Sequence, residues 1–186
     1  GGRIEQYVDI TEQKELQSRI ERLAVTDELT GVYNRRGLYE FGKRDLARAY
    51  RVGTPLCALF LDIDRFKSFN DQYGHTLGDL VLKELSFRIK HQIREMDLFA
   101  RFGGEEFVVL LPDTPLDQAS QMAERIRSVI ADTPFDLELD EVSVTISIGI
   151  TQFRPEDDLT SLLERADRGM YQAKNNGRNR LEWITS

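Results

Sequence analysis

The chain has 186 residues, of which 40% are hydrophobic and 31% are charged, and its formal net charge is −7. This size suits one domain with a substantial core plus a short extension. The acidic balance excludes a surface built to coat nucleic acid, and this fragment has no apolar run near the roughly 20 residues of a membrane span. A single cysteine, Cys57, excludes a disulfide framework. We therefore expect a reducing, cytoplasmic setting, although a full-length protein could be anchored in a membrane upstream.

Hydrophobic periodicity predicts three helices and one strand in the first half of the chain. In chain order these are a helix from Thr11 to Val25, a helix from about Arg35 to Val52, a strand from Leu56 to Leu61 and a helix after Gly78. The apolar stripe of the first helix is too short to certify a coiled coil. Gly53 and Pro55 end the second helix. The strand is continuously apolar, which is typical of a buried central strand.

The second half is predicted to contain a hairpin, two helices and two further strands. These are a hairpin with arms Leu98 to Ala100 and Phe107 to Leu111, a helix started by Thr114 and Pro115, a strictly alternating strand from Val142 to Ile150, a helix capped by Thr160 that runs to about Asn175, and a short strand from Leu181 to Ile184. Helices and strands alternate, with hairpin-like pairs among them. The sequence thus predicts an α/β fold in which helices flank a mixed central sheet.

The segment Gly103 to Phe107 has the most informative chemistry. Its two glycines allow a tight turn and leave a bare backbone, and Glu105 and Glu106 add adjacent negative charges. Asp62 ends the buried strand that could lie beside this hairpin. Carboxylates at neighbouring strand ends can hold two Mg²⁺ for displacement at phosphorus. Taken alone, the five residues are explained equally well as a solvated polar turn.

Several motifs in order resemble the GGDEF domain family, the diguanylate cyclases, over roughly Asp27 to Trp183. The matching motifs are Asp27–Gly31 with Asn34–Arg36, Asp62–Lys67, Asn70–Asp71 with Gly74–His75 and Gly78–Asp79, Gly103–Phe107, Ala166–Asp167, and Tyr171–Lys174 through Gly177–Arg180. The resemblance implies the fold shared with adenylyl cyclase catalytic domains and polymerase palms. It also implies condensation of two GTP into cyclic di-GMP by a homodimer, because each domain binds one GTP.

The resemblance further assigns residues to roles. Mg²⁺ (or Mn²⁺) would be held by Asp62, the carbonyl of Ile63, Glu105 and Glu106, with the two glutamates as the catalytic pair. Glu105 is the expected base for the 3′-hydroxyl, although the sequence leaves open which of the two glutamates takes that role. The substrate would contact Asn70 and Asp79 through guanine, Lys67, Lys174 and Arg178 through its phosphates, and Phe66. Simpler explanations exist: cations complement a helix C-terminus without any ligand, and Asn70 and Asp79 suit turns and caps.

A second site is implied just before the hairpin. In the family, an arginine and an aspartate at the positions of Arg94 and Asp97 hold intercalated cyclic di-GMP as a product inhibitor, and Arg125 matches a residue that completes such a site from a second face. The alternative is a surface ion pair between residues three apart.

The first residues resemble the last strand of a PAS sensor domain and the turn that leads into a signalling helix. The expected organisation is therefore a sensor remnant at 1–10, a signalling helix at 11–25 and the GGDEF domain at 26–186. Two rival functions remain open. One is a catalytically weak module that binds GTP or cyclic di-GMP, and the other is a different nucleotidyl transfer, such as that of an adenylyl cyclase.

Overall fold

The computed structural model describes residues 14, 24–137 and 140–184. The sensor remnant predicted at 1–10 and most of the helix predicted at 11–25 lie outside these residues. Within the described ranges, no helix is both long enough and apolar enough to cross a membrane.

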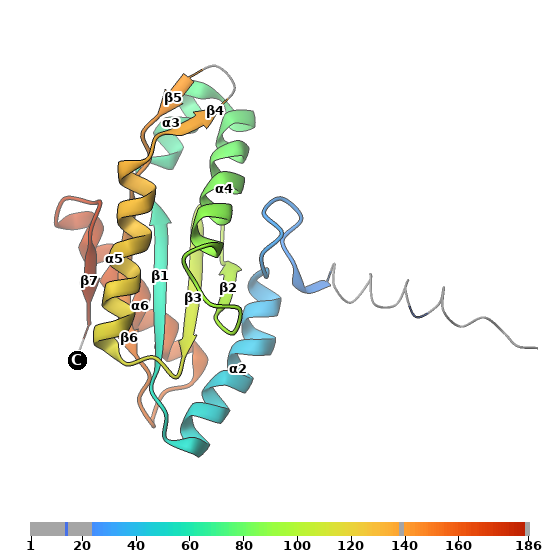
Figure 1. The fold of residues 1–186 in the computed structure, drawn as a ribbon, viewed down its shortest axis with the longest axis vertical. Helices are drawn as coiled ribbons and strands as arrows, with labels where there is room; N and C mark the ends of the chain where they lie inside the picture. The colour runs from blue at the N-terminus through green and yellow to red at the C-terminus, as the bar shows by residue number, and fades with distance from the viewer. Residues whose placement is uncertain (1–13, 15–23, 138–139, 185–186) are drawn as a thin grey trace, which may run out of the picture.

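A five-stranded mixed sheet forms the centre of the molecule, in the order β2-β3-β1-β6-β7 (Figure 1). Its strands are β1 (Leu56–Ile63), β2 (Leu98–Arg101), β3 (Glu106–Pro112), β6 (Ile146–Gln152) and β7 (Leu181–Trp183). β1 pairs antiparallel with both β3 and β6, while β7 runs parallel to β6. The predicted α/β fold with a mixed sheet is confirmed.

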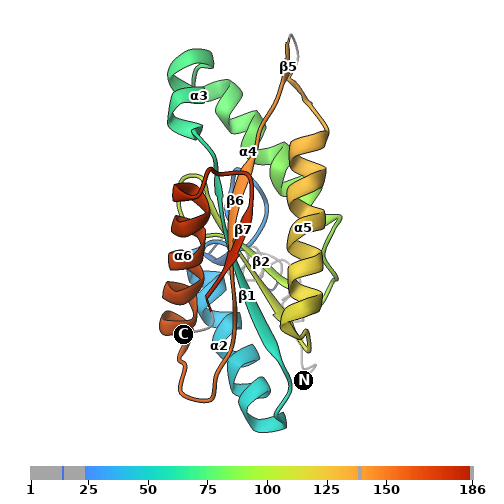
Figure 2. The ribbon, with the colours of Figure 1, turned by 90° about the vertical axis from the view of Figure 1, so that its left-hand side faces the viewer.

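Helices cover both faces of the sheet (Figure 2). α2 (Arg35–Val52) and α6 (Leu159–Asn175) pack on one face, and α4 (His75–Lys90) and α5 (Leu116–Asp132) pack on the other. Alternate residues of β1 enter the two resulting cores, so Leu59 faces one core and Phe60 the other. This double burial explains why β1 reads as a continuous apolar run instead of an alternating one.

The predicted helix from Arg35 to Val52 is confirmed at both ends. The Asn34 side chain accepts a 2.9 Å hydrogen bond from the backbone N–H of Gly37, and Gly53 ends the helix with φ of 75°. The predicted central strand, the hairpin arms and the final strand also form.

Other predicted boundaries were wrong, each for a local reason. The helix placed after Gly78 already begins at His75, and α3 (Phe66–Tyr73) went unpredicted because it is only 8 residues long. The last helix is capped by Asp158, which forms a capping box with Ser161, and not by Thr160.

The strand predicted from Val142 to Ile150 is two strands. Val142 ends β5 (Asp140–Val142), which forms a hairpin with β4 (Phe135–Leu137), and β6 begins only at Ile146. Thr114 does not cap α5, because the helix begins after Pro115 and the Thr114 hydroxyl donates to the carbonyl of Pro112.

Candidate active site

Two carboxylates predicted as metal ligands lie directly opposite each other in the sheet. Asp62 of β1 pairs with Glu106 of β3 in the antiparallel register. Asp62 is only 4% exposed, because both faces of β1 remain covered up to its end. Burial raises the pKa of Asp62 from 3.8 to about 6, and the negative charges of Glu105 and Glu106 add to this effect while Lys174 opposes it.

Lys174, near the C-terminal end of α6, enters the same site. Its Nζ lies 2.7 Å from Asp62 Oδ1. Burial also raises the pKa of Glu106, as does the charge of Asp167, whereas Lys174 and Arg35 counteract the rise. The site is therefore a concentration of negative charge that Lys174 only partly neutralises, which is an environment that favours cation binding.

The hairpin between β2 and β3 is fastened so that its tip meets the end of β1. The backbone N–H of Ile63 donates to the carbonyl of Glu105 at 3.3 Å. Arg101 donates to the carbonyls of Gly103 and Gly104 and forms an ion pair with Asp27 at 3.2 Å. A Cβ at Gly103 would lie 2.5 Å from Glu106 Oε2. Any other residue at position 103 would therefore displace the Glu106 carboxylate.

The donor chemistry of the site fits a hard divalent cation. Carboxylate oxygens of Asp62, Glu105 and Glu106, together with a backbone carbonyl, are the ligands that Mg²⁺ and Mn²⁺ prefer. Over the described ranges, however, no group of three or more His, Cys, Asp or Glu side chains is arranged so that it could hold a metal ion. Instead, the ammonium of Lys174 provides the positive charge beside Asp62.

The residues predicted to read guanine lie on two consecutive helices, Asn70 on α3 and Asp79 near the start of α4. Asn70 Oδ1 is buried and has no hydrogen-bond partner within the described part of the chain. It lies against Gly78, where any Cβ would collide with it. Asp79, the next residue, is exposed. A buried acceptor without a partner is costly, so Asn70 is suited to accept from a ligand.

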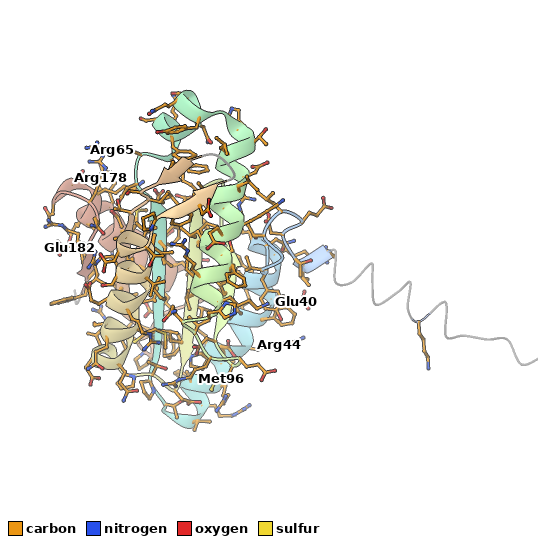
Figure 3. All side chains as sticks on the ribbon, turned by 45° about the horizontal axis from the view of Figure 1, so that its top comes forward. Glu40, Arg44, Arg65, Met96, Arg178 and Glu182 are labelled. Carbon is orange, nitrogen blue, oxygen red and sulfur yellow. The ribbon has the colours of Figure 1, made fainter. Side chains whose placement is uncertain are left out.

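The other predicted substrate residues divide into two groups. Lys67 and Arg178 are exposed, and Arg178 lies in the loop after α6 with φ of 65°. Figure 3 shows Arg178 and Arg65, the residue before α3, at the same corner of the molecule. The Phe66 side chain is only 6% exposed and packs in the core, which leaves its backbone as the part that a substrate could touch.

The second predicted site is a separate loop before β2. Asp97 Oδ2 accepts the backbone N–H of Arg94 at 2.7 Å, while its buried Oδ1 has no hydrogen-bond partner among the described residues. Burial raises the pKa of Asp97, and Arg94 opposes the rise. Arg125 of α5 reaches the same region and donates to the carbonyl of Gln92 at 2.6 Å. The Asp97 carboxylate thus binds the Arg94 backbone and leaves the guanidinium available.

This loop borders a cavity of about 670 Å³. The cavity is lined by Arg94, Asp97, Lys90, and residues of the segment from Val25 to Tyr33. Three residues that contribute to the sites were matched from the sequence only as parts of family motifs and were given no role of their own: Arg35, Asp64 and Asp167. A usable signal existed for Asp167, since it precedes Lys174 by seven residues and so lies two helical turns away on the same face.

The comparisons with known proteins identify what this arrangement resembles. The family model described as "Diguanylate cyclase, GGDEF domain" matches residues 24–180. The chain is 46% identical over 159 residues to the diguanylate cyclase DgcP of Pseudomonas aeruginosa, covering 86% of this chain and 24% of that protein. It is 49% identical over 162 residues to the response regulator PleD of Caulobacter vibrioides, covering 84% of this chain and 35% of that protein.

Solved structures agree with this similarity. The coiled coil and GGDEF domain of DgcB from Caulobacter crescentus, in complex with c-di-GMP, superposes with a TM-score of 0.90 at 30% identity, covering 95% of this chain and 94% of that one. The chain spans between about a quarter and a third of the length of the two curated relatives.

Proposed function

Because the chain belongs to the GGDEF diguanylate cyclase family, we propose that it condenses two GTP molecules into cyclic di-GMP and releases two pyrophosphates. The observation that carries this proposal is the direct pairing of Asp62 with Glu106 beside Lys174. The site combines strong negative charge, an exposed glycine turn and a nearby cation, which are the requirements of phosphoryl transfer.

Each residue has a defined task in this proposal. Asp62, the Ile63 carbonyl, Glu105 and Glu106 would hold Mg²⁺ or Mn²⁺, which when bound offsets charge on the phosphates and favours ionisation of the attacking 3′-hydroxyl. Glu105 accepts the proton of that hydroxyl. Lys174 leaves Asp62 for a phosphate oxygen, and the exposed Lys67 and Arg178 bind the other phosphates.

Guanine selection is assigned to Asn70 and Asp79. Guanine presents N–H donors at N1 and N2. The acceptors are the exposed carboxylate of Asp79 and the buried Oδ1 of Asn70, for which the described residues supply no hydrogen-bond partner. Adenine has no donor at N1, so ATP would leave a buried acceptor unpaired. A site of that kind discriminates strongly between the two purines.

The reaction requires two domains, because each supplies a single GTP with its hydroxyl and phosphate. We therefore infer a homodimer that holds the two hairpins face to face, regulated by product bound at Arg94, Asp97 and Arg125. A longer protein would supply the sensor, whose tail we place at 1–10 with a signalling helix at 11–25, and this domain would work in the cytoplasm.

Incubation with GTP or ATP and Mg²⁺, followed by chromatography of the products at several protein concentrations, tests the proposal. Cyclic di-GMP from GTP, with activity per molecule rising with protein concentration, supports it. Binding of GTP without turnover would favour a binding module, and a cyclic monophosphate from ATP would favour an adenylyl cyclase.

A further inference from the structure

The second aspartate of the Asp62-Ile63-Asp64 segment has a separate set of contacts. Its carboxylate accepts three hydrogen bonds: Oδ2 from the Thr145 hydroxyl at 2.7 Å and from the backbone N–H of Asn179 at 3.0 Å, and Oδ1 from the Ser147 hydroxyl at 2.6 Å. Its own backbone N–H donates to the carbonyl of Thr145 at 2.9 Å. Asp64 thus joins the end of β1 to β6 and to the loop after α6.

The loop that Asp64 holds has an unusual backbone. Gly177, Arg178 and Asn179 have φ values of 121°, 65° and 46°, so three successive residues have positive φ. A non-glycine residue in this region is strained and persists only where its surroundings fix it. Other hydrogen bonds hold the loop as well: Arg180 Nε donates to the carbonyl of Arg178 at 3.3 Å, and the carbonyl of Arg180 accepts from the backbone N–H of Ile148 at 2.9 Å. The backbone N–H of Arg178 donates to the carbonyl of Ala173, and the Asn179 side chain accepts from Arg127 at 2.7 Å.

We infer that Asp64 is a positioning residue for triphosphate binding, which sets the direction of Arg178 relative to the metal-binding end of β1. This inference rests on the proposed function, because it takes Arg178 as a phosphate contact. Asp64 is one residue from the Ile63 carbonyl, and its bond to Asn179 lies one residue from Arg178. A single carboxylate therefore couples two segments that would meet different parts of the same triphosphate.

Two substitutions separate hydrogen bonding from charge. Both Asp64→Ala and Asp64→Asn remove the negative charge, but asparagine can keep one carbonyl oxygen toward Thr145 and Asn179 while its amide donates to the Ser147 hydroxyl. Asp64→Ala removes every acceptor. Arg127→Ala is the matched control, because it removes the side-chain anchor of Asn179 and leaves its backbone bond to Asp64.

Calorimetry measures the affinity for two ligands. One is a non-reactive GTP analogue with a methylene bridge between its α and β phosphates, and the other is GMP. We expect Asp64→Ala to weaken binding of the triphosphate analogue about tenfold, which is the effect of losing one charge-assisted hydrogen bond. It should leave GMP binding unchanged. Asp64→Asn and Arg127→Ala should stay within about twofold of the unmodified chain, and adding Asp64→Ala to Arg178→Ala should cause no further loss, since both changes remove the same contact.

The outcomes are distinguishable. If Arg178→Ala alone leaves the triphosphate affinity unchanged, the proposed phosphate role of Arg178 fails. If Arg178→Ala weakens binding and Asp64→Ala does not, the inference about Asp64 is overturned. Equal losses for GMP and the analogue, or additive losses in the double variant, also overturn it, because a general structural defect would act on both ligands. Should Asp64→Ala not fold, Asp64→Glu keeps the charge but displaces the acceptors, and unchanged analogue affinity in that folded variant would overturn the inference.

Discussion

Lys174 places its ammonium 2.7 Å from Asp62 Oδ1, at the point where α6 passes the end of the central strand. The pair does not fully neutralise the site, because burial still raises the pKa of Asp62 to about 6. An ionised carboxylate in this environment destabilises the folded chain until a cation binds. Binding chemistry and folding stability are therefore opposed at this residue.

The first prediction concerns the pH dependence of stability. A folded-state pKa of about 6 lies above the ordinary 3.8, so the stability contributed by Asp62 is fully present below about pH 4 and is lost as the pH rises through 6. With metal chelated, Asp62→Asn should remove this loss and stabilise the chain at pH 8 by about 1–3 kcal/mol. Denaturant titrations at pH 4 and pH 8 measure it, with the exposed Glu156→Gln as control. Equal pH profiles for Asp62→Asn and the unmodified chain would refute the assignment.

The second prediction concerns the hairpin carboxylates. Glu105→Gln and Glu106→Gln keep the shape of each side chain but remove a charge that the proposed reaction requires. Turnover of GTP should fall by orders of magnitude in either variant. The two carboxylates would hold the metal ions, and these ions stabilise the negative charge that develops on the phosphate in the transition state. The thermal unfolding temperature should not fall. A folded variant with near-normal turnover would exclude the proposed role of that glutamate.

The third prediction uses the close contact between Gly78 and Asn70. Any Cβ at Gly78 would collide with Asn70 Oδ1, so Gly78→Ala should push this acceptor out of place. The preference for GTP over ATP should fall in Gly78→Ala and in Asp79→Ala, by up to about 10⁴ if the base pocket is well sealed. Competition binding with the two nucleotides measures the ratio. An unchanged ratio in both variants would mean that guanine is recognised elsewhere.

Sequence patterns predicted the parts of this molecule that repeat a simple rule. A continuous apolar run predicted β1, and helical spacing ended by Gly53 predicted α2. The failures lie where tertiary contacts override local pattern. The alternation from Val142 to Ile150 continues across two strands, because Val142 pairs with Phe135 in a separate hairpin. Only the folded chain shows that the Asp64 carboxylate binds Asn179, since this contact joins residues far apart in sequence.

The fourth prediction concerns a buried ion pair that supports the loop before α6. Arg165 donates to both carboxylate oxygens of Asp157, and the two side chains are 6% and 4% exposed. Burial would raise the pKa of Asp157, but hydrogen bonds from Arg165, Arg154 and Ser161 outweigh it and hold this pKa below its usual value.

Arg165→Met should therefore destabilise the chain by about 3–5 kcal/mol, because it leaves a buried carboxylate without its partner. The contribution of Asp157 is present above its ordinary pKa and is lost as the pH falls, so the difference between variant and unmodified chain should shrink in acid. Arg48→Met is the control, since the Arg48–Asp113 pair is exposed and should be worth less than about 1 kcal/mol. Equal losses in the two variants would contradict the argument.

The last prediction concerns feedback by product. The Asp97 carboxylate accepts from the Arg94 backbone at Oδ2, while Oδ1 has no hydrogen-bond partner in the part of the chain that the structure describes. Arg125 approaches the same loop through its hydrogen bond to Gln92. Stacked cyclic di-GMP presents phosphates to which an arginine can donate in pairs, and guanine edges from which an aspartate can accept. Product bound here would restrain how two domains approach each other without touching Asp62 or Glu106, which requires two separate sites and two domain arrangements.

Arg94→Ala should accordingly relieve product inhibition while it keeps or raises the initial rate. Titration of purified cyclic di-GMP into the unmodified chain and the variant gives the comparison, with Arg51→Ala, an exposed cation at the end of α2, as the control for charge alone. Relief in Arg94→Ala but not in Arg51→Ala supports a specific site, because both changes remove one positive charge. Identical inhibition curves for all three proteins would mean that Arg94 and Asp97 do not bind product, and that the Asp97 carboxylate only stabilises the turn before β2.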